Sequence, residues 1–224
     1  MTESVTLHAG GRSLTADLAL PAGSGTHGAL VLAHEWWGPN DDMRSIAERF
    51  AKEGFVALVP DLYFGERATD PTRAAELMGT MSTEVSMDVV RASVALLRAH
   101  PRVSGKVGIA GFCMGGAMSF AAATSVDGLA CAVPFYGIPR ADFFDPQKVR
   151  CPVQAHFAAR DDWAKPDVAA AFARDVNARG GRMDLFVYDA GHAFMRAGDP
   201  AVHDPVSAAL AWPRAVEFLH ARLG

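Results

Sequence analysis

Residues 111–116 read GFCMGG and join an expected strand, Lys106–Ala110, to a run of small residues that begins near Gly115. This pattern matches the strand–turn–helix elbow G-x-S-x-G, with cysteine in place of the nucleophilic serine. Glycines two residues before and two residues after Cys113 keep side chains from colliding in so tight a turn. The turn aims Cys113 away from the sheet and places it at a helix N-terminus, which favours a thiolate. The stretch therefore predicts an α/β protein with Cys113 as candidate nucleophile; a buried cysteine in a glycine-rich packing contact is the alternative.

Outward from this stretch, strands and helices alternate along the chain. Continuous apolar runs such as Ala29–Ala33 are typical of strands covered on both faces, whereas the alternation in Ser13–Leu20 suits a half-exposed hairpin around Gly10 and Gly11. We expect strands at 5–9, 13–20, 29–33, 55–59, 106–110, 129–135, 153–157 and 183–188. We expect helices from a cap at 41 or 42 through 52, at 71–78, at 83–99, from about 115, at 166–178 and at 205–223. The alternation predicts one domain, residues 1–224, with a mainly parallel central sheet flanked by helices and an antiparallel N-terminal hairpin at one edge.

Two of these helices carry more specific expectations. Asp41 or Asp42 is expected to cap the helix that ends at Lys52, with Gly54 as its stop signal. Pro213 is expected to bend the last helix, because proline removes a backbone donor.

The composition narrows the classes of function. With 21 Lys and Arg against 25 Asp and Glu among 224 residues, the net charge of −4 argues against a nucleic-acid-binding surface. The uncharged stretch Val107–Val126 contains four glycines, so we interpret it as a buried strand and helix rather than a membrane span. The N-terminus lacks the features of a signal peptide, which predicts a cytoplasmic protein. Of the three cysteines, Cys131 and Cys151 lack the context of Cys113 and are expected to be structural.

A thiol nucleophile needs a base, and the base needs an orienting carboxylate. In this type of fold the acid and then the histidine follow the nucleophile, each after a later strand. Asp161 and His192 occupy those positions, at the carboxyl ends of expected strands. Asp162 is the local rival of Asp161, and the rivals of His192 are His203, in a loop, and His220, in the last helix. The remaining histidines are interpreted as structural: His8, His27, His100 and His156.

The stretch HEWWG at residues 34–38 follows the expected strand Ala29–Ala33 directly. It is not the zinc motif H-E-x-x-H, because residue 38 is glycine. This is the place where proteins with a nucleophile elbow carry the second oxyanion-hole amide. A carboxylate there, Glu35, is costly unless it is paired, which indicates a role; a solvent-exposed loop over two packed tryptophans is the alternative.

Taken together, these residues resemble the dienelactone hydrolase family (carboxymethylenebutenolidases), within the α/β-hydrolase fold. The resemblance covers nearly the whole chain and rests on HEWWG at 34–38, PDLY at 60–63, GFCMGG at 111–116, RD at 160–161 and GHAF at 191–194. It implies that Cys113 is the nucleophile, His192 the base and Asp161 its orienting acid. Glu35 resembles the glutamate of the family that holds the resting thiol and shifts when substrate arrives.

The resemblance also implies a substrate site. The backbone amides of Trp36 and Met114 correspond to the oxyanion hole, and Arg196 to the arginine that binds a substrate carboxylate. Arg73 is the available candidate for a second family arginine, although Leu77 stands where the family has a tyrosine.

Four aromatic side chains are candidates for the pocket wall, with core packing as the alternative for each: Trp36, Trp37, Tyr136 and Trp163. We expect a monomeric hydrolase of small-molecule esters or enol-lactones, acting through an acyl-thiol intermediate, without metal or organic cofactor and without nucleic-acid or membrane partners. The alternatives are a carboxylesterase or thioesterase on the same scaffold, and a non-catalytic binding or redox-sensing thiol protein.

Overall fold

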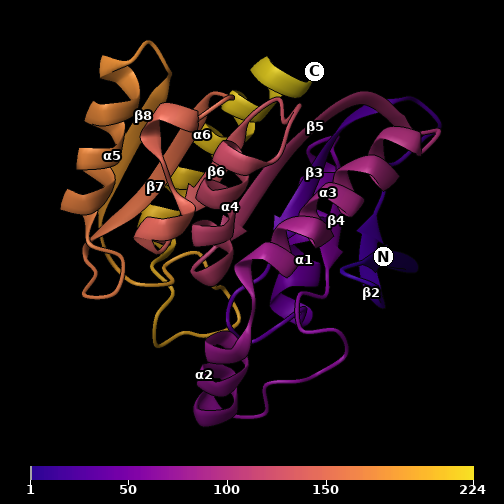
Figure 1. The fold of residues 1–224 in the computed structure, drawn as a ribbon, viewed down its shortest axis with the longest axis horizontal. Coiled ribbons are helices and arrows are strands. Elements are labelled where there is room, and N and C mark those ends of the chain that lie inside the picture. Colours follow the sequence, from indigo (N-terminus) through magenta and orange to yellow (C-terminus); the bar gives the residue numbers. More distant parts are fainter. Residues whose placement is uncertain (1) are drawn as a thin grey trace.

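The computed structural model describes residues 2–224, in which strands and helices alternate as expected (Figure 1). The strands are β1 (Thr2–Ala9), β2 (Arg12–Ala19), β3 (His27–Ala33), β4 (Val56–Pro60), β5 (Val103–Phe112), β6 (Ala132–Phe135), β7 (Val153–Arg160) and β8 (Met183–Gly191). The helices are α1 (Asp41–Lys52), α2 (Pro71–Thr80), α3 (Thr83–Ala99), α4 (Met114–Ser125), α5 (Pro166–Ala178) and α6 (Pro205–Leu223), with short 3-10 turns η1 (Ala141–Phe143) and η2 (Pro146–Lys148). Met1, the first residue of the expected domain and of the segment judged to lack a signal peptide, lies outside the described residues.

All eight strands belong to one sheet in the order β1-β2-β4-β3-β5-β6-β7-β8. The strands β3 to β8 pair in parallel, whereas β2 pairs antiparallel with both β1 and β4. The turn between β1 and β2 uses Gly10 and Gly11, both at positive φ, a region that glycine enters without steric cost. The expected mainly parallel sheet with an antiparallel N-terminal hairpin at its edge is therefore confirmed.

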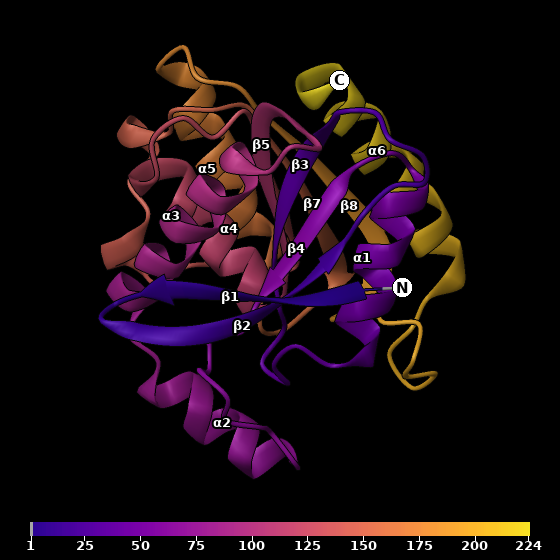
Figure 2. The same cartoon turned by 90° about the vertical axis from the view of Figure 1, so that its right-hand side faces the viewer.

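Helices cover both faces of the sheet (Figure 2). One face carries α1 and α6, whose apolar side chains pack with Leu30, Leu32 and Ala57 from the strands. The other carries α3, α4 and α5, which pack with Val31, Leu58 and Ile109. In both views α2 projects from the rest of the molecule. Among residues 2–224, no helix is long and apolar enough to cross a membrane.

The cap of α1 and the bounds of several strands differ from the local expectations. The residue that caps α1 is Asn40, whose side-chain oxygen accepts a hydrogen bond from the amide of Met43, so the expectation for Asp41 or Asp42 was wrong. Those two acids occupy the first turn of α1, where they face the positive end of the helix dipole. The strand expected from residue 129 begins at Ala132, although the carbonyl of Cys131 already accepts from the amide of Ile109. The helix α6 continues through Pro213.

The parallel strands bring their carboxyl ends to one edge of the sheet. Cys113 follows β5, Asp161 follows β7 and His192 follows β8, while Glu35 lies two residues beyond the end of β3. This edge is where open α/β sheets bind ligands. Strands β7 and β8 both run three residues further than expected, so each ends directly before a candidate site residue.

Candidate active site

Cys113 occupies a strained turn between β5 and α4, with φ 54° and ψ −116°. The turn is tight because glycines surround it. A Cβ at Gly111 would collide with the carbonyl of Gly115, and a Cβ at Gly115 with the carbonyl of Ala33. The Cys113 amide donates to the carbonyl of Phe135, which fixes the turn against β6. The elbow expected from the sequence is therefore present, and its local strain is held by packing on both sides.

Other residues with strained backbone angles lie near this turn. Among the described residues, four non-glycine residues have positive φ, and three of them are Cys113, Tyr136 at 34° and Ala193 at 62°. Tyr136 and Ala193 both line cavities that Cys113 also lines. Strained backbone of this kind costs about 1–3 kcal/mol per residue and clusters at functional sites.

Cys113, His192 and Asp161 form a continuous chain of contacts. His192 Nε2 lies 3.1 Å from Cys113 Sγ, and His192 Nδ1 lies 2.8 Å from Asp161 Oδ2. The other Asp161 oxygen accepts from the amides of Trp163 and Ala164, both at 2.9 Å. Because Nδ1–H donates its hydrogen bond to the carboxylate, Nε2 is the nitrogen that faces the thiol. Asp162 is exposed, and among residues 2–224 the hydrogen-bonded carboxylate partner of His192 is Asp161 and not Asp162.

The contacts between His192 and Asp161 shift the pKa values of both side chains. Burial alone would lower the pKa of His192, but hydrogen bonds to Asp161 and Cys113, with their charges, raise it to about 10. Burial would raise the pKa of Asp161, yet the hydrogen bonds from His192 and the Ala164 amide hold it below its usual value. These contacts thus favour a protonated His192 beside the Asp161 carboxylate.

Glu35 is buried beside this chain and has two partners. Its Oε1 accepts from the Tyr136 hydroxyl and its Oε2 pairs with Arg196 Nη1, both at 3.3 Å. Burial raises the pKa of Glu35, although the Arg196 charge opposes the shift. No hydrogen bond between Glu35 and the Cys113 thiol is found within residues 2–224, where the thiol faces His192.

Arg196 is held between two carboxylates. Its second nitrogen pairs with Asp199 at 3.2 Å, and the side chain is only 12% exposed. Its Nε is buried and has no hydrogen-bond partner among the described residues. An unpaired buried donor costs roughly 1–3 kcal/mol, so this nitrogen favours a ligand or water oxygen.

Hydrogen bonds of the His34 and Tyr63 side chains hold the loop at residues 34–38 in place. The sequence alone indicated no role for either side chain. The buried His34 donates from Nδ1 to the carbonyl of Glu35 at 2.6 Å and accepts at Nε2 from the Leu62 amide at 3.1 Å. Burial lowers the pKa of His34 to about 4, which keeps Nε2 an acceptor. The Tyr63 hydroxyl donates to the carbonyl of Trp36 at 2.9 Å and contacts Met114 Sδ at 3.4 Å.

A signal for this brace exists in the sequence. The motif PDLY at residues 60–63 begins at the last residue of β4 and the motif HEWWG at 34–38 follows β3, and neighbouring parallel strands end side by side. Residues that follow two such strands are expected to meet.

Two cavities open at Cys113 and His192. One has a volume of about 160 Å³ and also contains Glu35, Trp36 and Arg196. The other, of about 380 Å³, also contains Met114 and Tyr136. Trp163 lies at the rim of both cavities and is 77% exposed.

Arg73 and Trp37, two further candidates for substrate binding, lie outside both cavities. Arg73, on α2, pairs with Glu66 in the preceding loop and with Glu76 on the same helix, and it lines neither cavity. Trp37 packs edge-on against Trp36, with ring centroids 5.2 Å apart, and is likewise outside both linings.

The rival histidines are separate from the site. His203 contacts the carbonyl of Phe194, and His220 packs against Phe55. His156 is buried, with Nδ1 2.8 Å from the Tyr188 hydroxyl and Nε2 3.0 Å from Gln154 Oε1.

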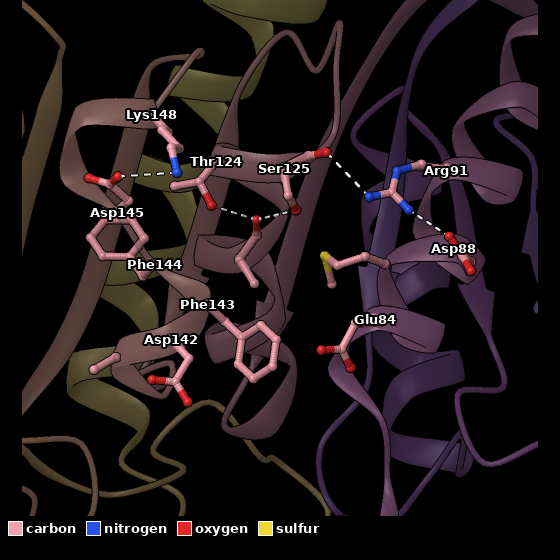
Figure 3. A pocket seen from close by; sticks show the side chains of 13 residues that line it. Glu84, Asp88, Arg91, Thr124, Ser125, Asp142, Phe143, Phe144, Asp145 and Lys148 are labelled. Carbon is pink, nitrogen blue, oxygen red and sulfur yellow. Dashed lines mark hydrogen bonds and ion pairs between the residues drawn. The ribbon is translucent and has the colours of Figure 1, made fainter.

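A further hollow of about 310 Å³ lies beside α3 and α4 (Figure 3). Its lining includes Arg91, paired with Asp88, and Lys148, paired with Asp145. Both cations are therefore paired, and Cys113, His192 and Asp161 do not line this hollow. The candidate catalytic residues lie instead at the carboxyl edge of the sheet.

The sheet order, the elbow after β5, the acid after β7 and the histidine after β8 are the features of an α/β hydrolase. The protein is thus of the α/β-hydrolase class.

Comparisons with known proteins narrow the class. The chain matches the model of the dienelactone hydrolase family over residues 14–223. It is 36% identical to Protein usf of Aquifex pyrophilus over 199 residues, 84% of this chain and 86% of that one. It is 30% identical to a carboxymethylenebutenolidase of Pseudomonas sp., covering 89% and 87% of the two chains. A dienelactone hydrolase-like promiscuous phosphotriesterase from metagenomic libraries shares the fold, with a TM-score of 0.88, 22% identity and coverage of 100% and 99%.

The chain belongs to the dienelactone hydrolase family, which confirms the resemblance drawn from its motifs. It is a hydrolase that acts on ester or lactone bonds.

Proposed function

We propose that the protein opens a small ester or enol-lactone through a thioester formed on Cys113, with His192 as the proton carrier and Asp161 as its orienting acid. The observation that carries the proposal is the unbroken chain from Cys113 Sγ to His192 at 3.1 Å and on to Asp161 at 2.8 Å, at the mouth of two cavities. Nucleophile, base and orienter within hydrogen-bond reach are the requirement for this chemistry.

The reaction follows in two steps. The Cys113 thiolate attacks the carbonyl carbon and forms a C–S bond, and the tetrahedral oxyanion then expels the alkoxide or enolate, which takes a proton from His192. Neutral His192 next removes a proton from water as the hydroxide attacks the thioester, and collapse releases the acid and restores the thiolate. The raised pKa of His192 supports a resting imidazolium, ready to protonate the leaving oxygen.

The oxyanion would be held by the amides of Trp36 and Met114. Met114 is the first residue of α4, where the helix leaves its amides without intrahelical acceptors. One such donor contributes about 3–4 kcal/mol to transition-state stabilisation. Because all three cysteines are free, we place the activity in a reducing cytoplasm.

Acyl-enzyme trapping tests the proposal. Rapid mixing with p-nitrophenyl acetate should give a burst of one nitrophenolate per active site, and mass spectrometry of the quenched protein should find the acetyl group on Cys113. A redox-sensing or binding protein would give neither result. An adduct on another residue would reject Cys113 as the nucleophile.

The brace of the oxyanion loop gives a second prediction. Tyr63→Phe removes the hydrogen bond to the Trp36 carbonyl and should lower kcat by about 3- to 10-fold, the equivalent of one net hydrogen bond. KM should stay unchanged, because Tyr63 lines neither of the two cavities at Cys113. Tyr188→Phe is the matched control, since it removes a buried hydroxyl bonded to His156 away from the thiol. If both variants lose thermal stability equally and neither loses kcat, Tyr63 is only structural.

Charge selectivity gives a third prediction. Arg196→Ala should reduce kcat/KM for an acidic lactone about 10- to 100-fold more than for a neutral aryl ester, as expected for a lost charge-assisted hydrogen bond. If a substrate carboxylate must draw Arg196 from Glu35, neutral esters should already be slow in the parent protein. Arg44→Ala, which also removes two ion pairs, serves as the control away from the site. Equal losses on both substrates, with a lower melting temperature, would assign Arg196 to local structure instead.

A further inference from the structure

The two cavities at Cys113 differ in chemistry. The smaller, of about 160 Å³, contains the buried Glu35–Arg196 pair, and we call it the charged compartment. The larger, of about 380 Å³, has no carboxylate in its lining. Cys113 and His192 line both, so a carbonyl held at the thiol would send one substituent into each compartment.

The larger cavity has an apolar lining drawn from three parts of the chain. The end of α2 and the residue after it contribute Met78, which also lines the charged compartment, and Met81. The first turns of α4 contribute Ala117 and Met118, and the segment after β6 contributes Ile138, Pro139 and Phe143. We call this cavity the methionine compartment. Its arginine, Arg140, is 79% exposed and pairs with Asp142 at 3.6 Å. Methionine is flexible and polarizable, so such a lining adapts to apolar groups of varied shape.

The two compartments also differ in the size of the chemical group that each can hold. Pockets for small molecules span about 300–1,000 Å³. The methionine compartment lies inside this range and the charged compartment lies below it. The charged compartment therefore suits a small polar or anionic group, while the methionine compartment has room for a substituent much larger than a methyl group.

We propose that the methionine compartment binds an alkyl chain of hexanoyl or hexyl length, so that the substrate is an ester or lactone with an apolar arm on one side of the carbonyl. The inference rests on the proposed function of Cys113, because the compartment is defined by its opening at that thiol. Both the acyl part and the alcohol part of an ester have the required chemistry, and two substrate series separate them.

The first experiment measures kcat/KM for p-nitrophenyl acetate, butyrate and hexanoate, and for methyl, butyl and hexyl acetate, each relative to its alkaline hydrolysis rate. Burial of each added methylene should contribute to binding, so one series should rise by about 10- to 100-fold from its shortest to its longest member. The rising series identifies the arm as acyl or alcohol. A flat or falling profile in both series would overturn the inference.

Variants of the wall localise the effect. Ala117→Leu narrows the compartment and should reduce the preference for the long chain, measured as the ratio of kcat/KM for the longest ester to that for the shortest, by at least about tenfold. Phe143 lines both the methionine compartment and the hollow of Figure 3, so Phe143→Ala should open one into the other and extend the preference to longer chains. Ala141→Leu is the matched control, because Ala141 lines that hollow but not the compartment.

The outcomes separate the two proposals. A normal Cys113 adduct with profiles that ignore chain length, or a chain preference that Ala117→Leu and Ala141→Leu change equally, would overturn the methionine compartment alone. Absence of both ester turnover and the Cys113 adduct would overturn the proposed function, and this inference with it.

Discussion

Cys113→Ala is expected to lower kcat for ester hydrolysis by at least about 10⁴-fold, the scale on which loss of a nucleophile acts in a triad. The variant should still fold, because alanine retains the Cβ and adopts the same turn, and the backbone bonds to Phe135 and Ala117 do not use the thiol. Cys113→Ser should remain slower than the parent, since surroundings tuned for a thiolate do not ionise a hydroxyl.

The matched control for this prediction is Cys151→Ala. Cys151 is a buried free thiol, whereas Cys113 is half-buried, and Cys151 precedes β7 and lines neither cavity. Its loss should reduce stability slightly and leave kcat unchanged. Turnover of more than a few per cent in Cys113→Ala, with melting curves showing a folded protein, would mean that another group attacks the ester.

Asp161→Asn has the second largest expected effect, a fall in kcat of about 10³- to 10⁴-fold. The asparagine oxygen can still accept from the amides of Trp163 and Ala164, so its nitrogen would face His192 Nδ1. His192 would then carry its proton on Nε2, pointing at the thiol, and could not act as a base. Asp162→Asn, at the exposed neighbour, should change kcat little, and equal losses in the two variants would contradict the assignment.

The pH dependence of kcat/KM gives a further test of Asp161→Asn. Folding raises the pKa of His192 from its ordinary value of 6.5 to about 10. The imidazolium therefore stabilises the fold fully below pH 6.5, and this contribution is lost as the pH rises through about 10. The alkaline limb of kcat/KM should lie near that value in the parent and move to lower pH in Asp161→Asn, because the bond and charge that raise the pKa are gone. An unmoved limb would assign it to another group.

The sequence by itself determined the architecture and the chain order of the site. Hydrophobic periodicity and turn residues depend on neighbouring positions, which is why α3, α5 and α6 have the predicted bounds and the hairpin lies at the sheet edge. The elbow was predictable for the same reason, since the glycines at 111 and 115 act on contacts within the turn and against the adjacent strand.

Only the tertiary structure decided which side chains meet. Asp161 and Asp162 are neighbours in the chain, yet the Trp163 and Ala164 amides hold the first toward His192 and leave the second in water. The bonds of Tyr63 to the Trp36 carbonyl and of Arg196 to Glu35 likewise span loops far apart in sequence. Such contacts depend on how separate strands end beside one another, and no local pattern encodes those distances.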